Sequence, residues 1–298
     1  RNHTSKKILV LWETLLDNYK LYNPRRVHIA VSSLTLLKAL IQSKKPRRIH
    51  LFINTGMNRE WLQHYELLQA LQLLQNNNTL AVEGIMSHLA TSDDSDNTLT
   101  LQQYHQFLDA VQLITSYGHT PRYIHLSNSA WLSKLPKDDI LTASRVGLAL
   151  YGYNPLSVSD PHYDYYAWLR QALRVLSTVT SVQHISAWSY AWYGTHRQAP
   201  HDTTLATIAF WYFEWLPRWS VGYQIYHGDT PLALVGKTCM NLSIIDGGNH
   251  PLRYGDQVEL IWRDPDRNNT ISHLAKLNHT IPYTILVGLE RGLRREIV

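Results

Sequence analysis

Apolar residues follow two alternating patterns along the first half of the chain. Longer segments, such as residues 62–74 and 101–114, carry leucine and other apolar side chains at three- and four-residue spacing, which predicts amphipathic helices. Between them lie short runs rich in valine, isoleucine and leucine, which predict buried strands. This alternation indicates a parallel sheet with right-handed crossover connections. The predicted strands are residues 7–12, 27–32, 49–54, 82–88, 123–128 and 146–152.

The pattern changes after residue 176. Short apolar runs are then separated by turns containing Gly, Asp, Asn and Pro, and residues 272–277 form the first clear helical pattern. This half therefore predicts an antiparallel β domain. We expect a barrel domain over residues 1–170 and the β domain over residues 171–298, with a polar linker at 154–166. Because a closed (β/α)8 TIM barrel needs eight strands, we expect a partial barrel that lacks about its first two βα units.

Composition and charge exclude several classes of protein. The chain is 44% hydrophobic and 17% charged, which is typical of a globular protein and not of a disordered one. The net charge is +5, but the short basic runs at 25–26 and 44–48 flank prolines and indicate solvated loops, so we expect no nucleic-acid partner. No apolar run approaches the ~18 residues of a membrane span, and no signal peptide is apparent. The single cysteine, Cys239, excludes an internal disulfide and favours a cytoplasmic location.

Polar residues stand where the predicted strands end, which is where barrels of this kind hold their active sites. His88 ends the fourth strand, Asn128 ends the fifth and Ser129 follows it, and Arg145 and Gly147 stand at the sixth. A serine hydroxyl with backbone N–H groups beside a glycine can bind a phosphate, and arginine supplies a permanent charge. Taken alone, however, such a histidine is more often structural, and such an arginine more often forms a surface ion pair.

Taken together, these segments resemble the alanine racemase family, whose members are pyridoxal-phosphate (PLP) enzymes with a barrel and a C-terminal β domain. The strongest matches are TGMNR at 55–59, HLSNS at 125–129 and RVGLALYG at 145–152. Weaker matching segments follow in family order over nearly the whole chain, including WSYAWYGTHRQA at 188–199 and LVGKTCMNLSIID at 234–246. The resemblance implies a homodimeric, cytoplasmic isomerase that interconverts L- and D-alanine for peptidoglycan synthesis.

The resemblance also implies residue roles, and we expect no metal site. Arg145 matches the arginine that bonds the pyridine nitrogen and keeps it unprotonated, which restrains side reactions. Tyr193 matches the catalytic tyrosine, which acts in the active site of the other subunit. Ser129, Gly147 and Leu148 match residues that bind the phosphate, and Asn128 and His88 match residues that support the cofactor ring and the arginine. Arg59 matches the arginine that holds the substrate carboxylate. Tyr212 and Met240 match residues of the partner subunit that line the substrate entrance.

Racemisation needs two bases on opposite faces of Cα, and the second base of the family is the lysine that binds PLP. The sequence has no counterpart of this lysine, so we expect the chain as given to be an inactive fragment of a racemase. Alternatives are a non-catalytic or decayed relative, or a PLP-binding barrel without racemase activity, although the β domain argues against the latter. Two departures from the family stand out: Phe52 replaces a common lysine that supports the substrate arginine, and Asn241 replaces a common aspartate.

Tryptophan and glycine contents are unusual together. The chain has ten tryptophans and only 14 glycines in 298 residues, whereas glycine usually makes up ~7%. Side chains this large do not fit where glycine allows a positive φ or a close approach. We therefore hypothesise that UGA codons meaning glycine were read as tryptophan; genuine tryptophans in a core or a stacking platform are the alternatives. Eight tryptophans fall on glycine positions of the family, namely Trp12, Trp61, Trp168, Trp188, Trp192, Trp211, Trp215 and Trp262.

Overall fold

The computed structural model describes residues 5–13, 15–136, 140–190, 198–262, 267–289 and 292–297. The chain forms two compact units. The first contains Arg1–Leu150 and Asn154–Leu169, and the second contains Tyr151–Tyr153 and Arg170–Val298. In the described part of the chain, no helix combines the length and apolar composition that crossing a membrane requires.

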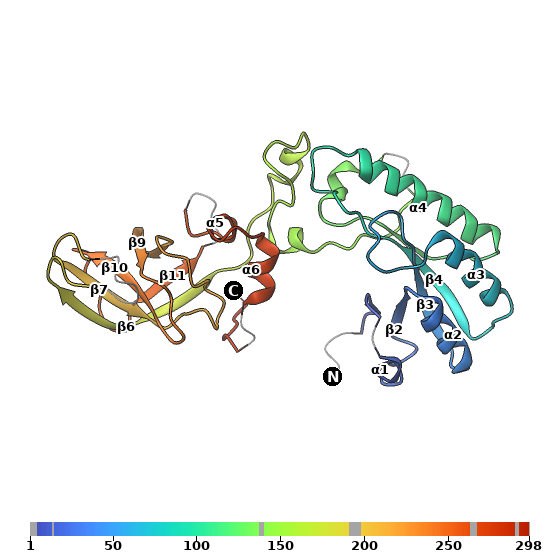
Figure 1. Ribbon diagram of the computed structural model, residues 1–298, viewed down its shortest axis with the longest axis horizontal. Coiled ribbons are helices and arrows are strands. Elements are labelled where there is room, and N and C mark those ends of the chain that lie inside the picture. The colour runs from blue at the N-terminus through green and yellow to red at the C-terminus, as the bar shows by residue number, and fades with distance from the viewer. Residues whose placement is uncertain are drawn as a thin grey trace. The chain divides into compact units, whose positions relative to one another are not determined.

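The first unit is built on a five-stranded parallel sheet in the order β1-β2-β3-β4-β5, as the alternating sequence pattern predicts. Successive strands pair with one another, and helices connect them (Figure 1). This arrangement is the partial TIM barrel expected from the sequence. The strands are β1 (Ile8–Val10), β2 (Val27–Val31), β3 (Arg47–Phe52), β4 (Leu80–Met86) and β5 (Tyr123–His125), and the helices are α1 (Leu16–Tyr19), α2 (Leu34–Gln42), α3 (His64–Gln75) and α4 (Thr98–Ser116).

Alternating strand residues separate an outer from an inner face of this sheet. Ile29, Ile49 and Ile85 point to the face that α2, α3 and α4 cover, where they join the main hydrophobic core. The next residues along the strands, including Ala30 and Met86, form a separate small cluster on the opposite face. Buried polar side chains on that inner face, such as His50, find hydrogen-bond partners on other strands of the same sheet.

Local capping fixes where two of the helices begin. The Ser33 side chain accepts a hydrogen bond from the backbone N–H of Leu36 at the start of α2. At the start of α3, Gln63 and Glu66 form a reciprocal capping box. Helix α2 thereby begins three residues after the end of β2, whereas α3 begins only after the loop 53–63 that follows β3.

The predicted sixth strand at residues 146–152 is wrong. Residues Leu148–Tyr151 form a 3-10 helix, η2, and only the isolated bridge between Asn128 and Arg145 continues the parallel pairing. The backbone turns here because the Ser129 hydroxyl accepts hydrogen bonds from the N–H groups that a strand would use, and because Gly152 has a φ of 80°. An apolar run this short does not distinguish a strand from a tight helical turn.

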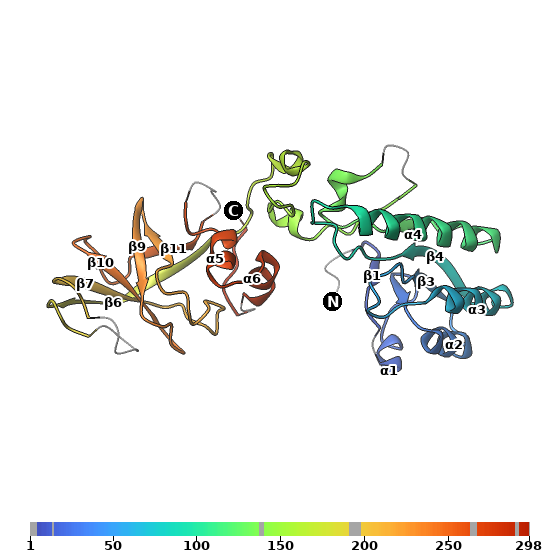
Figure 2. The same cartoon turned by 45° about the horizontal axis from the view of Figure 1, so that its top comes forward.

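The second unit is a closed antiparallel barrel in the order β10-β7-β6-β11-β8-β9, followed by two short helices (Figure 2). The antiparallel β domain and a helix near residues 272–277 are confirmed, whereas β8 and α6 give no clear sequence signal. The elements are β6 (Val175–Ile185), β7 (Thr203–Ile208), β8 (Gln224–His227), β9 (Thr230–Val235), β10 (Ser243–Gly248), β11 (Gln257–Ile261), α5 (Ile271–Leu277) and α6 (Pro282–Gly288).

Three of the tryptophans at family glycine positions adopt backbone conformations that favour glycine. The φ angles are 125° at Trp61, 66° at Trp188 and 89° at Trp215, in a region that L-residues with large side chains rarely enter. The indole N–H of Trp61 is also buried and has no hydrogen-bond partner among the described residues. The Trp215 ring lies so close to Gly288 that a Cβ at Gly288 would overlap it. These features agree with the hypothesis that glycine stands at these positions in the natural protein.

Candidate active site

Arg145 is the centre of a polar cluster at the carboxyl ends of β4 and β5. Its Nη1 donates to the carbonyl of His125 at 2.6 Å and contacts Nδ1 of the same residue at 3.0 Å. Its Nη2 donates to the carbonyl of Ser87 and lies 3.4 Å from that of Leu126. Burial lowers the pKa of Arg145 to about 10, so the guanidinium stays charged at neutral pH. Carbonyl groups from two strand ends therefore hold a fixed cation above the sheet.

His88 lies beside this arginine, as the sequence interpretation expects. Its Nδ1 is 3.3 Å from Arg145 Nη2. Burial, with the positive charges of Arg145 and Arg59, lowers the pKa of His88 to about 4. The imidazole is therefore neutral at pH 7 and accepts a hydrogen bond from the arginine through Nδ1.

The loop after β5 forms a small cradle in which backbone N–H groups surround a serine hydroxyl. Ser129 Oγ accepts hydrogen bonds from the backbone N–H groups of Gly147, at 2.9 Å, and Ala149, at 3.4 Å. Asn128 holds this loop in shape, since its Oδ1 accepts from the N–H groups of residues 130 and 131 and its Nδ2 donates to Ser92 Oγ at 2.7 Å. A hydroxyl and adjacent backbone N–H groups converge here, as phosphate binding requires.

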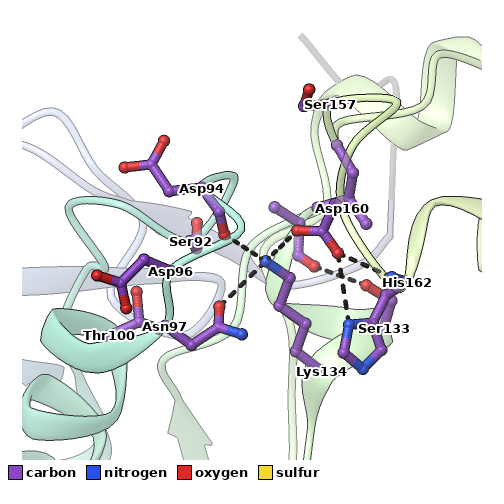
Figure 3. A network of polar contacts seen from close by, with 12 residues as sticks. Ser92, Asp94, Asp96, Asn97, Thr100, Ser133, Lys134, Ser157, Asp160 and His162 are labelled. Atoms are coloured by element: carbon purple, nitrogen blue, oxygen red, sulfur yellow. Dashed lines mark hydrogen bonds and ion pairs between the residues drawn. The ribbon is translucent and has the colours of Figure 1, made fainter.

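A buried ion pair braces the same loop (Figure 3). Lys134 Nζ lies 2.7 Å from Asp160 Oδ2, and the two side chains are 2% and 0% exposed. Lys134 also donates to the carbonyl of Asp94 at 2.7 Å and to Asn97 Oδ1 at 3.1 Å. Burial alone would raise the pKa of Asp160, but hydrogen bonds from Lys134 and His162 hold it below its ordinary value. The network therefore ties together the loops after β4 and β5 and the 154–166 segment.

Arg59 lies in the loop after β3, close enough to His88 for its positive charge to lower the pKa of that imidazole. Asn54 shapes this loop, because its Oδ1 accepts from the N–H groups of residues 56 and 58 at 3.1 Å each. The Arg59 guanidinium stacks on the rings of Trp12, at 4.5 Å, and Trp61, at 4.9 Å. Phe52 is buried against Trp61 with a ring separation of 4.3 Å. Apolar contacts thus occupy the place where the family commonly has a lysine.

The remaining expected site residues belong to the second unit or lie outside the described residues. Tyr212 follows β7 and is 40% exposed, and Met240 precedes β10 and is 64% exposed. Their loops contact one another, since the Thr238 backbone N–H and hydroxyl both donate to carbonyls of the 210–220 loop. Tyr193 lies in the segment 191–197, outside the described residues.

Sequence reasoning missed two parts of the site. His125 bonds Arg145 through Nδ1, and its position in HLSNS, on the inner face of β5, could have revealed it. The Lys134–Asp160 pair had no comparable signal, because its partners are 26 residues apart and neither lies in a predicted helix or strand.

Comparisons with known proteins agree with this architecture. The family model "Alanine racemase, N-terminal domain" matches residues 1–155, and "Alanine racemase, C-terminal domain" matches residues 172–297. An alanine racemase of Deinococcus deserti is 32% identical over 274 residues, which cover 91% of this chain and 72% of the relative. One from Lactococcus lactis subsp. lactis is 26% identical over 300 residues, covering 99% and 79%.

Solved structures show the same fold. An alanine racemase from Clostridium difficile 630 aligns with a TM-score of 0.86 at 22% identity, covering 97% of this chain and 76% of that one. The alanine racemase from E. faecalis aligns with a TM-score of 0.81 at 25% identity, covering 96% and 77%. With both family models matched in order and a relative above 30% identity, the chain belongs to the alanine racemase family.

Proposed function

We propose that this protein is a PLP-dependent alanine racemase that interconverts L- and D-alanine, with peptidoglycan synthesis as the use of its product. The observation that carries the proposal is the pairing of a fixed arginine with an anion cradle. Arg145 is held by carbonyls of residues 87 and 125, and Ser129 with the N–H groups of residues 147 and 149 forms the cradle in the same unit. Membership of the alanine racemase family supports alanine as the substrate.

The residues present fit PLP. The Ser129 hydroxyl would hold the phosphate together with the backbone N–H groups of Gly147 and Ala149, which now bond this hydroxyl, and that of Leu148 between them. The Arg145 guanidinium would face the pyridine nitrogen. An arginine whose pKa remains near 10 keeps its proton at neutral pH, so that nitrogen would receive a hydrogen bond and no proton. Asn128 and His88 would support the ring and the arginine from the sides.

When bound, the cofactor supplies delocalisation of the negative charge that develops at Cα. The protein must then remove a proton from one face and return one to the other. Tyr193 is the proposed base on one face, and Arg59 would hold the substrate carboxylate. The neutral His88 beside Arg145 provides an acceptor that keeps the guanidinium in place without adding a second positive charge.

The proposed assembly is a cytoplasmic homodimer in which Tyr193, Tyr212 and Met240 serve the active site of the partner subunit. Exposure of Tyr212 and Met240 on contacting loops of the second unit supports this arrangement, because side chains that complete another subunit's site must be accessible before assembly. We also propose that the two domains divide near residue 170.

The test is racemisation of L-alanine by the protein produced from its whole gene. We expect D-alanine, measured by chiral chromatography, to form only when PLP is supplied, and Arg145→Ala to reduce the rate strongly. A folded, PLP-saturated protein that forms no D-alanine would overturn the proposal and favour a non-catalytic relative. A control variant, Arg122→Ala, removes an arginine beside β5 that does not contact the cluster.

A further inference from the structure

A row of three histidines lies inside the partial barrel, on the face opposite the helices. His28 comes from β2, His50 from β3 and His125 from β5, and the three side chains are 2%, 3% and 3% exposed. His28 Nδ1 lies 3.0 Å from His50 Nε2, and His50 Nδ1 lies 2.8 Å from His125 Nε2. The row ends at Arg145, whose Nη1 is 3.0 Å from His125 Nδ1. The proposed chemistry assigns no role to His28 or His50.

Gly84 allows the row to cross a strand. His50 and His125 stand on β3 and β5, which both pair with β4, so the imidazole of His50 must pass over β4. The β4 residue that pairs with His50 is Gly84. A Cβ at Gly84 would overlap the His50 ring. The Tyr123 ring stacks on His50 at 5.6 Å with an interplanar angle of 18°. Because Gly84 has no side chain, space remains over β4 at this position, and the His50 imidazole occupies it.

The arginine dictates the direction of every hydrogen bond in the row. Arginine has donors and no acceptor, so His125 Nδ1 must accept and its proton must be on Nε2. This Nε2–H then donates to His50 Nδ1, which places the His50 proton on Nε2 in turn. His50 Nε2–H donates to His28 Nδ1 by the same reasoning. All three rings are neutral and share one tautomer.

The three buried histidines stabilise the folded state less than apolar side chains at the same positions would. Three imidazoles are removed from water, and His28 Nε2 is buried without a hydrogen-bond partner in the described part of the chain. A buried donor without an acceptor costs about 1–3 kcal/mol, and apolar side chains at these positions would avoid that loss. A polar row in a barrel interior therefore suggests a task other than stabilising the fold.

We propose that His50 and His28 are positioning residues for Arg145, which they orient through a one-way chain of Nε2-protonated imidazoles. Each Nε2–H that donates to the next ring fixes the tautomer of the donating ring and makes its Nδ1 a better acceptor. His125 is thereby held as an acceptor for Arg145 Nη1, and the guanidinium keeps one orientation. The functional benefit of a fixed Arg145 orientation rests on the proposed racemase function, whereas the assignment of one tautomer to all three histidines does not.

The test is nitrogen-15 NMR of the histidine rings in the 298-residue chain, with no cofactor or substrate. We expect His28, His50 and His125 to be protonated on Nε2 alone from pH 6 to pH 8. A proton on Nδ1 of any of the three, or a charged ring at pH 6, would overturn the proposal. Because this readout needs neither PLP nor turnover, failure of the racemase assay would leave it unaffected.

Variants then test whether the row acts on Arg145. We expect His50→Phe to give His125 a mixture of tautomers and to speed exchange of the Arg145 guanidinium hydrogens about tenfold. His50→Gln offers both an acceptor and a donor, so it should restore the single tautomer at His125. The control, His119→Phe, removes a partly buried histidine outside the row and should change neither signal. Equal signals at His125 and Arg145 in His50→Phe and the unaltered chain would overturn the positioning role.

Discussion

Replacing Trp188 by glycine should stabilise the second unit, which is unusual for loss of an aromatic residue. Trp188 has a φ of 66°, and the left-handed conformation costs a non-glycine residue about 1–2 kcal/mol. The side chain is 69% exposed, so its removal uncovers little apolar surface. Glycine costs about 0.5–1 kcal/mol through the greater freedom of the unfolded chain. We expect a net gain of about 0.5–1 kcal/mol, or about 2–4 °C in Tm, measured by circular dichroism during urea and thermal unfolding.

Trp219 offers a matched control in the same unit. It is 67% exposed, its φ is not left-handed, and its ring contacts Lys237 Nζ at 4.4 Å. Trp219→Gly therefore brings the entropic cost of glycine and the loss of a cation–π contact without relief of strain, and we expect a loss of about 1–2 kcal/mol. The two variants should differ in sign. If Trp188→Gly destabilises the protein as much as Trp219→Gly, the backbone argument for glycine at position 188 is refuted.

Three further predictions concern the first unit. Burial lowers the pKa of His50 to about 3 and of His125 to about 2. Because the unfolded state binds these protons first, below pH 6.5, each histidine should reduce the free energy of unfolding by about 2 kcal/mol between pH 7 and pH 5. Urea midpoints independent of pH would contradict this. Lys134→Met should cost about 3–5 kcal/mol by removing the buried cation that compensates the charge of Asp160, whereas Lys134→Met with Asp160→Leu should recover most of that loss. Ser129→Ala should weaken PLP binding about tenfold in a spectrophotometric titration while Ser133→Ala, on the next turn, leaves it unchanged; equal affinities would remove Ser129 from the cradle.

The strand-and-helix alternation and the change to an antiparallel domain could be read from the sequence, because side-chain periodicity reports which face each element buries. Residues 146–152 could not be read correctly. Their apolar composition suits a strand, and the deciding interactions are two hydrogen bonds that the backbone N–H groups of residues 147 and 149 donate to Ser129 Oγ. Such a contact between distant segments leaves no periodic signal.

The candidate site, like the fold, could be predicted from the sequence only in part. His88 and Ser129 stand at the carboxyl ends of predicted strands, so the topology brings them to one edge, whereas Arg145 precedes the predicted sixth strand and only the resemblance to the family assigned it to the site. His50 was not anticipated, because its role depends on the absence of a side chain at Gly84 on the neighbouring strand. Pairing across a sheet depends on register, which the sequence of one strand does not contain.

The central claim is that this protein exchanges the Cα proton of alanine from both faces. The most direct measurement is deuterium incorporation at Cα in heavy water, starting from L-alanine or D-alanine, with PLP and the protein produced from its whole gene. We expect deuterium incorporation from both enantiomers, and a strong loss of incorporation from at least one of them in Tyr193→Phe. A folded, PLP-saturated protein that leaves the Cα proton of both enantiomers in place would contradict it.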